Sequence, residues 1–462
     1  MSEYRTEEDT LGPVKIPAEA LWGPQTERSR NNFPTGQYMP LAIIRALLNI
    51  KKAAAQANME TKAISEEKGN LIVKAIDELL ALSDEDLRKD FPLKVYQTGS
   101  GTQTNMNTNE VVAHKAHEIN PDIEILPNDD VNKGQSSNDT FPTAMNVVAL
   151  EALDKLKPAV QHLIDELKIK EEKYMKTVKV GRTHLQDAVP LTFGQELSGY
   201  IASLEHDLDY IKTLEPTLDE LAIGGTAVGT GLNAAEGMPE KIAEKLSEVY
   251  GLNLTADSNK FYGLANHSGL DVVHGALKTL AADMFKLAQD IRFLASGPRA
   301  GYGELNIPAN EPGSSIMPGK VNPTQAEAVT MAALRVFGND TVVTMASSQG
   351  NFEMNVYKPV LIDAFLESAD LLNGTITGFA DKMIHGMTVN EKRMEELVDN
   401  SLMTVTALSP HIGYHDSAKI AQAADKAGST LKEAALKSGK LTEEQYDEWM
   451  DMLKMTNVDR DK

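Results

Sequence analysis

A repeated apolar pattern between residues 267 and 297 constrains the fold more than any other feature of the sequence. Its apolar residues are separated alternately by three and four positions: Leu270, Val273, Leu277, Leu280, Met284, Leu287, Ile291 and Leu294. This spacing is typical of a helix that packs against others along its whole length, here over roughly 45 Å. Alanines on other faces, such as Ala276 and Ala281, indicate that the helix is buried on several sides.

Further helical patterns indicate that this helix belongs to a bundle. They cover residues 41–59, 69–88, 143–175, 192–221, 325–347 and 356–384. The first 40 residues are rich in turns and have room for one small hairpin, and short helices follow Val389. We therefore expect an all-α chain of three domains: a mostly helical N-terminal domain at 1–138, a central domain of long helices at 139–389 and a small helical C-terminal domain at 390–462.

The composition disfavours several classes of function. The 462 residues include 45 Lys and Arg against 67 Asp and Glu, a net charge of −22, which argues against binding to nucleic acid. An anionic substrate must then be attracted by a local positive charge. The absence of cysteine excludes disulfides, thiol nucleophiles and thiolate metal sites. We see neither a membrane span nor a signal peptide, and expect a cytoplasmic protein without a membrane partner.

Three polar loops, each followed by a helical pattern, are the candidate binding segments. They cover residues 99–105, 135–140 and 313–323. The unpaired N–H groups at helix starts suit anions. Serine, asparagine and glycine are also the residues that any helix start prefers, so a purely structural role stays open for each loop taken alone.

The third loop is the most specific of the three. Lys320 has no acidic neighbour between Glu311 and Glu327, so it can present its ammonium group to an anion. Asn322 precedes a proline and could instead cap the following helix, which would leave its amide less free to bind substrate. Among the ten histidines, His184 lies in a polar stretch without a helical pattern, and no histidine pair comes with a third ligand that would predict a metal site.

The third loop reads GSSIMPGKVNP. It resembles the mobile loop of the fumarase/aspartase superfamily, whose shared pattern is Gly-Ser-x-x-Met-x-x-Lys-x-Asn. Over essentially the whole chain, further segments are similar to class II fumarases: GSGTQTNMNTNE, NDDVNKGQSSNDTFPTAMN, GRTHLQDAVPLTFGQE, GGTAVGTGLN and SQGNFEMNVYKP. Aspartases typically read MPAKVNPV and STNDAYPTG, whereas this chain reads MPGKVNPTQ and SSNDTFPTA, which favours the fumarase branch.

The resemblance implies a reversible trans-elimination that converts L-malate into fumarate and water through an aci-carboxylate intermediate. It implies that no metal and no organic cofactor takes part. It also implies a homotetramer in which the long helices of four subunits form the central bundle. In such a tetramer each active site is assembled from three subunits.

The resemblance also assigns roles to individual residues. Ser314 matches the base that removes the carbon-bound proton, and His184 matches a general acid that pairs with Glu327. Because histidine has also been considered as the base, the division of labour between Ser314 and His184 stays open. The positions that match substrate contacts are Ser100, Thr102, Ser136, Ser137, Asn138, Thr183, Ser315, Lys320 and Asn322.

One segment departs from the family pattern. Many class II fumarases read His-Pro-Asn-Asp there, with an arginine three residues before the histidine, and these residues form a second, non-catalytic anion site. This chain has Ile123 and Leu126 at the two basic positions, followed after Pro127 by Asn128 and Asp129. We therefore expect a degraded second site at Asn128 and Asp129 that binds dicarboxylates poorly or not at all.

Two other interpretations remain open from the sequence. The first is an aspartate ammonia-lyase of the same superfamily, which would release ammonia from L-aspartate instead of water from L-malate. The second is a non-catalytic structural relative, in the way that lens crystallins relate to argininosuccinate lyase. The presence of Ser314, Lys320, Asn322, Glu327 and His184 together argues against the second.

Overall fold

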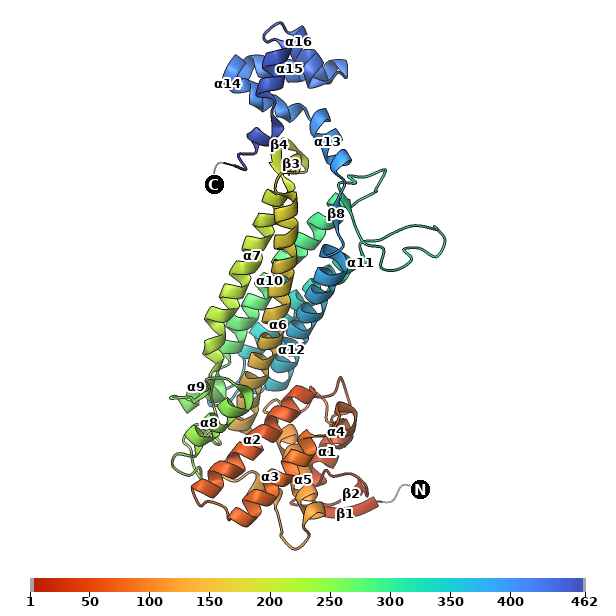
Figure 1. The fold of residues 1–462 in the computed structure, drawn as a ribbon. Coiled ribbons are helices and arrows are strands. Elements are labelled where there is room, and N and C mark those ends of the chain that lie inside the picture. The colour runs from red at the N-terminus through yellow and green to blue at the C-terminus, as the bar shows by residue number, and fades with distance from the viewer. Residues whose placement is uncertain (1–3, 460–462) are drawn as a thin grey trace. The chain divides into compact units, whose positions relative to one another are not determined.

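The computed structural model describes residues 4–459, and within them it is built mainly of helices (Figure 1). Five helices are long: α6 (Ser137–Tyr174), α7 (Phe193–Leu214), α10 (Ser268–Leu294), α11 (Thr324–Ser347) and α12 (Lys358–Phe379). They cover the ranges in which long helices were expected, and the eight apolar residues of the α10 repeat are all buried. The prediction of an all-α fold with long helices is confirmed.

The chain divides into two compact units, each of which combines several stretches of sequence. The first unit consists of Met1–Leu156, Asp209–Thr279 and Leu334–Leu371, and the second of Lys157–Leu208, Leu280–Ala333 and Leu372–Lys462. Each of the five long helices contributes residues to both units. The division into three domains at residues 138 and 389 stays a prediction.

The first unit begins with the expected small hairpin, formed by β1 (Tyr4–Asp9) and β2 (Gly12–Pro17). Outside the five long helices, it also contains α1 (Pro24–Asn32), α2 (Leu41–Glu60), α3 (Glu66–Leu80), α4 (Asp84–Asp90), α5 (Thr102–Ile119), a π-helical turn (Pro127–Val131), β5 (Glu220–Leu221), α8 (Met238–Tyr250), β6 (Thr255–Ala256) and α9 (Lys260–Ala265). The single helix expected at 69–88 is instead two helices, because the Ser83 side chain accepts the N–H of Asp86 and starts α4.

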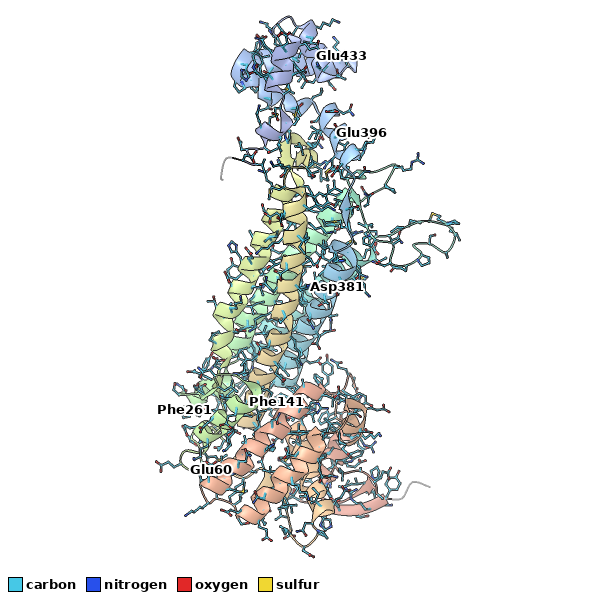
Figure 2. The ribbon with its side chains drawn as sticks, viewed as in Figure 1. Glu60, Phe141, Phe261, Asp381, Glu396 and Glu433 are labelled. Atoms are coloured by element: carbon cyan, nitrogen blue, oxygen red, sulfur yellow. The ribbon has the colours of Figure 1, made fainter. Side chains whose placement is uncertain are left out.

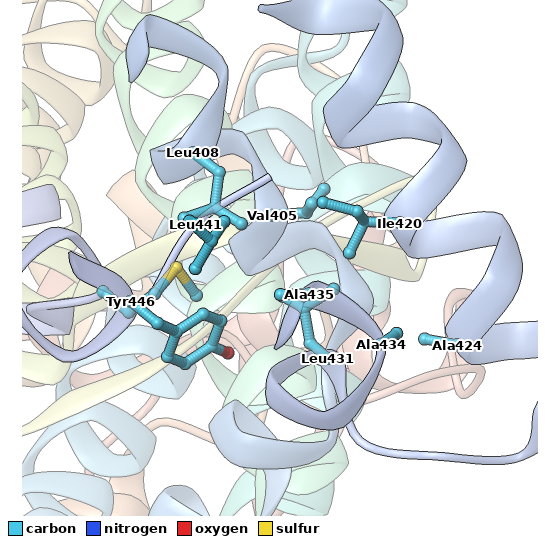
Figure 3. Packing of buried hydrophobic residues seen from close by; sticks show 10 residues of the cluster. Val405, Leu408, Ile420, Ala424, Leu431, Ala434, Ala435, Leu441 and Tyr446 are labelled. Carbon is cyan, nitrogen blue, oxygen red and sulfur yellow. The ribbon is translucent and has the colours of Figure 1, made fainter. Parts of the chain in front are cut away.

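The second unit contains a hairpin of β3 (Val178–Thr183) and β4 (Gln186–Thr192), which the sequence did not predict. A further strand pair joins β7 (Leu305–Asn306) to β8 (Thr388–Val389). The chain ends in α13 (Glu391–Asn400), α14 (Ser409–Ile412), α15 (Tyr414–Ala427), α16 (Leu431–Lys437), α17 (Glu443–Trp449) and α18 (Met452–Met455). Buried apolar side chains, among them Leu408, Ile420 and Leu431, form a small core of their own here (Figure 3).

No helix within residues 4–459 combines the length and the apolar character that a membrane span requires.

The second unit buries a carboxylate to which no group donates a hydrogen bond within residues 4–459. It is that of Asp207, on α7, whose side chain is fully buried and whose two oxygens find no donor in this part of the chain. Burial, and after it the nearby carboxylate of Asp283 on α10, raises the pKa of Asp207 from 3.8 to about 7. The native state therefore holds this proton more tightly than the unfolded chain, so the stability that it contributes is lost as the pH rises from about 4 to about 7.

We expect Asp207→Asn to remove much of this pH-dependent loss of stability, since the asparagine amide stays neutral and can donate to Asp283. The melting temperature of the variant should exceed that of the unchanged chain by a few degrees above neutral pH and should match it near pH 4. Thermal unfolding measured at several pH values checks this. Parallel curves for the two proteins across the whole range would contradict it.

Candidate active site

Hydroxyl groups from the first two polar loops meet in the first unit. The Ser100 Oγ lies 2.7 Å from the Thr102 Oγ1, which in turn lies 2.8 Å from the Ser137 Oγ. Thr102 begins α5 and Ser137 begins α6, so the cluster lies where two helices start and backbone N–H groups are unpaired. We call Ser100, Thr102 and Ser137 the hydroxyl cluster, and it has the donors that a carboxylate requires.

The hydroxyl cluster depends on a glycine between its members. Gly101 has a φ of +81°, a left-handed conformation that side chains disfavour. A Cβ atom on Gly101 would also collide with the ring of Phe141, a fully buried residue of α6 that is labelled in Figure 2. Both the turn and the close approach of α5 to α6 therefore require glycine at this position.

Ser136 and Asn138 are the neighbours of Ser137 in the chain, and Asn138 is bonded to another loop. The Ser136 Oγ accepts the N–H of Asn138 at 3.2 Å, and the Asn138 side chain donates to the carbonyl of Ala227 at 2.8 Å. The five residues predicted from the first two loops thus lie together in the first unit.

Sequence reasoning missed Asp139, which ties these loops together. Its buried carboxylate accepts the backbone N–H groups of Ser136, Gly224 and Thr226, each at 2.9 Å. Burial raises the pKa of Asp139 to about 6, although the three N–H groups oppose the shift. An acidic residue in the first turn of a predicted helix usually complements the helix dipole, so the sequence offered no signal of this second role.

His184 and Thr183 lie in the second unit, at the tip of the β3–β4 hairpin, where both are exposed. The two central residues of the turn, His184 and Leu185, have φ values of +57° and +60°. Two residues with positive φ match the twist of a tight hairpin, but for a histidine and a leucine the conformation is strained. Such strain persists only where the surrounding structure holds it.

Buried charges hold the base of this hairpin. Arg182 donates to the fully buried carboxylate of Glu304 and stacks on the Tyr302 ring, 4.6 Å from its centroid. Lys179 lies 2.5 Å from Glu196 and 3.6 Å from Glu304. Two cations of β3 thus pair with two carboxylates from other elements, next to the end of the strand that leads to His184.

The third polar loop, residues 313–323, is closed at its base. The Gly313 N–H donates to the Lys320 carbonyl at 2.9 Å, and the Asn322 side chain donates to the Gly313 carbonyl at 2.7 Å. The Ser314 Oγ accepts the N–H groups of Ile316 at 3.3 Å and Met317 at 3.1 Å. The side chains of Ser315 and Lys320 are exposed.

Within residues 4–459, the structure gives no hydrogen bond from His184 to Glu327 or to Ser314. Glu327 lies in the first turn of α11, where its N–H donates to the Pro323 carbonyl. The pairing of His184 with Glu327 therefore does not form inside one chain and stays a prediction. Over the same residues there is also no group of three or more His, Asp or Glu side chains placed to hold a metal ion.

Asn128 and Asp129 lie in the π-helical turn and line a cavity of about 600 Å³ together with Leu126 and Arg28. The Arg28 guanidinium is engaged by Asp9, at 2.8 and 2.9 Å. A lining of acidic residues around an arginine that is already paired is a poor receptor for a dicarboxylate. This lining is consistent with a second anion site that binds dicarboxylates poorly, and that weak binding stays a prediction.

Sequence profiles of two families match the chain: one described as lyase, over residues 12–338, and one described as fumarase C C-terminus, over residues 405–457. The class II fumarate hydratase of Listeria monocytogenes serotype 4b is 54% identical over 456 residues, which span 98% of this chain and 100% of that protein. The chain belongs to the class II fumarase family. The class II fumarate hydratase of Bacillus cereus is 52% identical to this chain over 459 residues, which span 98% of this chain and 99% of the Bacillus protein.

A solved structure agrees with this assignment. The class II fumarase from Schistosoma mansoni is 43% identical and superposes with a TM-score of 0.94, over 98% of this chain and 99% of that one. The fold and the family that the sequence motifs indicated are therefore confirmed.

The buried charges at the hairpin base generate a prediction for this fumarase-family chain. Glu304→Gln leaves Arg182 without a full counter-charge and loosens the strand that leads to His184. We expect turnover to fall by about 10- to 100-fold, since a small misplacement of a reacting group has effects of this size. The melting temperature should fall as well, because a buried pair loses one partner.

Steady-state kinetics and thermal unfolding of the variant measure both effects. The control is Glu172→Gln, which makes the same change at an exposed position of α6 in the second unit. Unchanged turnover in Glu304→Gln would show that the hairpin does not depend on this pair.

Proposed function

We propose that the chain is a hydro-lyase that interconverts L-malate and fumarate plus water by trans-elimination. The observation that carries the proposal is the hydroxyl cluster at two helix starts in a chain of the class II fumarase family. A cluster of neutral donors suits one carboxylate of a dicarboxylic acid. The exposed loop at 313–323 supplies the groups assigned to the reacting end.

The difficult step is removal of a weakly acidic proton next to a carboxylate, which leaves extra negative charge on that carboxylate. Catalysis requires donors where this charge develops. In the proposal Lys320 and Asn322 supply them. The bond from Asn322 to the Gly313 carbonyl supports a fixed position for its amide.

Ser314 is proposed as the base. A serine hydroxyl is a weak base unless its oxyanion is stabilised. The N–H groups of Ile316 and Met317, which Ser314 Oγ already accepts, are suited to that task. His184, paired with Glu327, then protonates the leaving hydroxyl, and a carboxylate partner would favour the charged form of the imidazole.

The proposal includes a homotetramer, in which His184, Glu327 and the hydroxyl cluster of different subunits meet. Helix α11 supports it, because this helix is apolar on two faces. One face is buried within the chain, and the other exposes Met331, Leu334, Val342 and Met345. Apolar residues repeated on an exposed helix face are typical of contacts between subunits. We also propose that the protein is cytoplasmic, that it uses no cofactor, and that it binds neither nucleic acid nor a membrane.

The first experiment is an ultraviolet assay for fumarate with L-malate in excess chelator, run beside an ammonia assay with L-aspartate. We expect fumarate from L-malate and none from L-aspartate. Ammonia from L-aspartate instead would assign the chain to the aspartate ammonia-lyases. Activity with neither substrate from an intact oligomer would support a non-catalytic relative.

Ser314→Ala tests the assignment of the base. We expect turnover to fall by about 10²- to 10⁴-fold, the usual contribution of a general base, while the chain stays folded and oligomeric. Steady-state kinetics and light scattering measure these quantities. The matched control is Ser258→Ala, at an exposed serine between β6 and α9. Near-normal turnover in Ser314→Ala would move the role of base to another residue, with His184 first in line.

A further inference from the structure

Lys358, the first residue of α12, has a buried ammonium group. Its side chain is fully buried, and none of the described residues, 4–459, offers its Nζ a hydrogen-bond acceptor. The other fully buried lysine in the first unit differs in this respect. Lys51 donates to Asn132 Oδ1 at 2.8 Å and to Gln135 Oε1 at 2.9 Å. Burial of an ammonium group without acceptors lowers the stability of the fold, so folding alone does not explain Lys358.

Lys358 lies directly against the loop that carries the hydroxyl cluster. Its N–H donates to the carbonyl of Gly99, the residue before Ser100, at 3.1 Å. The approach is so close that a Cβ atom on Gly99 would collide with the carbonyl of Val356. The segment that starts α12 therefore forms the back of the loop that begins at Gly99.

The buried charges around this loop do not cancel. Asp139 is the carboxylate whose charge acts on both Lys51 and Lys358. Burial lowers the pKa of Lys358 to about 8 and that of Lys51 to about 7, and Asp139 opposes both shifts. Burial, and after it the charge of Lys358, lowers the pKa of His267 to about 3, so His267 is neutral. Near neutral pH these pKa values leave Lys358 and Asp139 mostly charged and Lys51 partly charged, so the local charge is positive by part of one charge.

A positive charge beside the 99–105 loop provides the local attraction for an anionic substrate that the acidic composition of the chain requires. The chain has a net charge of −22, so its overall field repels a dicarboxylate. A local charge in a buried, weakly polarisable setting acts strongly over short distances, because water does not screen it. Lys358 supplies such a charge, because its backbone pairs with Gly99 next to Ser100 and its ammonium interacts with the charge of Asp139, two residues from Ser137.

We propose that Lys358 is a positioning residue for the substrate, whose buried charge attracts and orients the carboxylate that the hydroxyl cluster holds. The proposal rests on the proposed function and adds to it a group outside the three polar loops, in the family-like segment SQGNFEMNVYKP to which the resemblance assigned no role. Lys358 acts through the field at the hydroxyl cluster and through Gly99, because its Nζ is too deeply buried to touch a ligand.

Lys358→Met tests the proposal, since methionine fills a similar volume without a charge. We expect the KM for L-malate and the dissociation constant of succinate, a dicarboxylate that cannot react, to rise at least about tenfold. The kcat should stay within about threefold, because the charge acts on the bound carboxylate in the ground state and in the transition state alike. The melting temperature should stay equal or rise, because an uncompensated buried charge is removed.

The control is Lys74→Met, which changes the net charge equally at an exposed position of α3. It should leave all four quantities unchanged. Lys358→Gln serves as a second neutral variant with the same expected loss of affinity. If both Lys358 variants bind succinate as well as the unchanged chain does, or if both fail to fold, Lys358 has a structural role and the proposal is wrong.

The two proposals fail in distinguishable ways. If the unchanged chain binds succinate but does not turn over L-malate, the proposed function fails, and the succinate measurements on Lys358→Met still test the inference. If the unchanged chain turns over L-malate and Lys358→Met has the same KM, the inference alone fails.

Discussion

Burial of the long helices is the constraint on which the candidate site depends. Four of these helices begin at, or just after, a segment that carries a candidate residue: Ser137 starts α6, the β3–β4 hairpin leads into α7, the 313–323 loop leads into α11, and Lys358 starts α12. Buried apolar side chains hold each helix in place, and this anchors the end of the polar segment that precedes it. Helix starts also supply the N–H groups that favour anions.

The sequence allowed most of this frame to be predicted, because apolar periodicity directly reflects burial. The α10 repeat and the other long helices were accessible from this periodicity, whereas the hydroxyl residues were assigned only through the family resemblance. The β3–β4 hairpin was not, since its strands are short and its turn uses His184 and Leu185 instead of the glycine or asparagine that mark such turns. The split between α3 and α4 was missed because a single serine cap decides it.

Buried charges were the second class of feature that sequence reasoning missed. A lysine within a helical pattern normally indicates a solvated face, yet Lys51 and Lys358 are fully buried. Asp139 and Glu304 are acidic residues whose partners are remote in sequence, and only the folded chain reveals them. The pairing of His184 with Glu327 is not formed within the described chain, and it remains a prediction that the proposed assembly of each active site from several subunits would have to satisfy.

The exposed apolar face of α11 has a consequence for how the proposed enzyme assembles after synthesis and how it is inactivated. A single chain that leaves Met331, Leu334, Val342 and Met345 in water is prone to unspecific association until its proper partners cover them. In the proposed tetramer, assembly protects this face and completes each active site in the same step. Dilution would then inactivate the enzyme as effectively as heat does, and newly made chains would depend on meeting one another quickly.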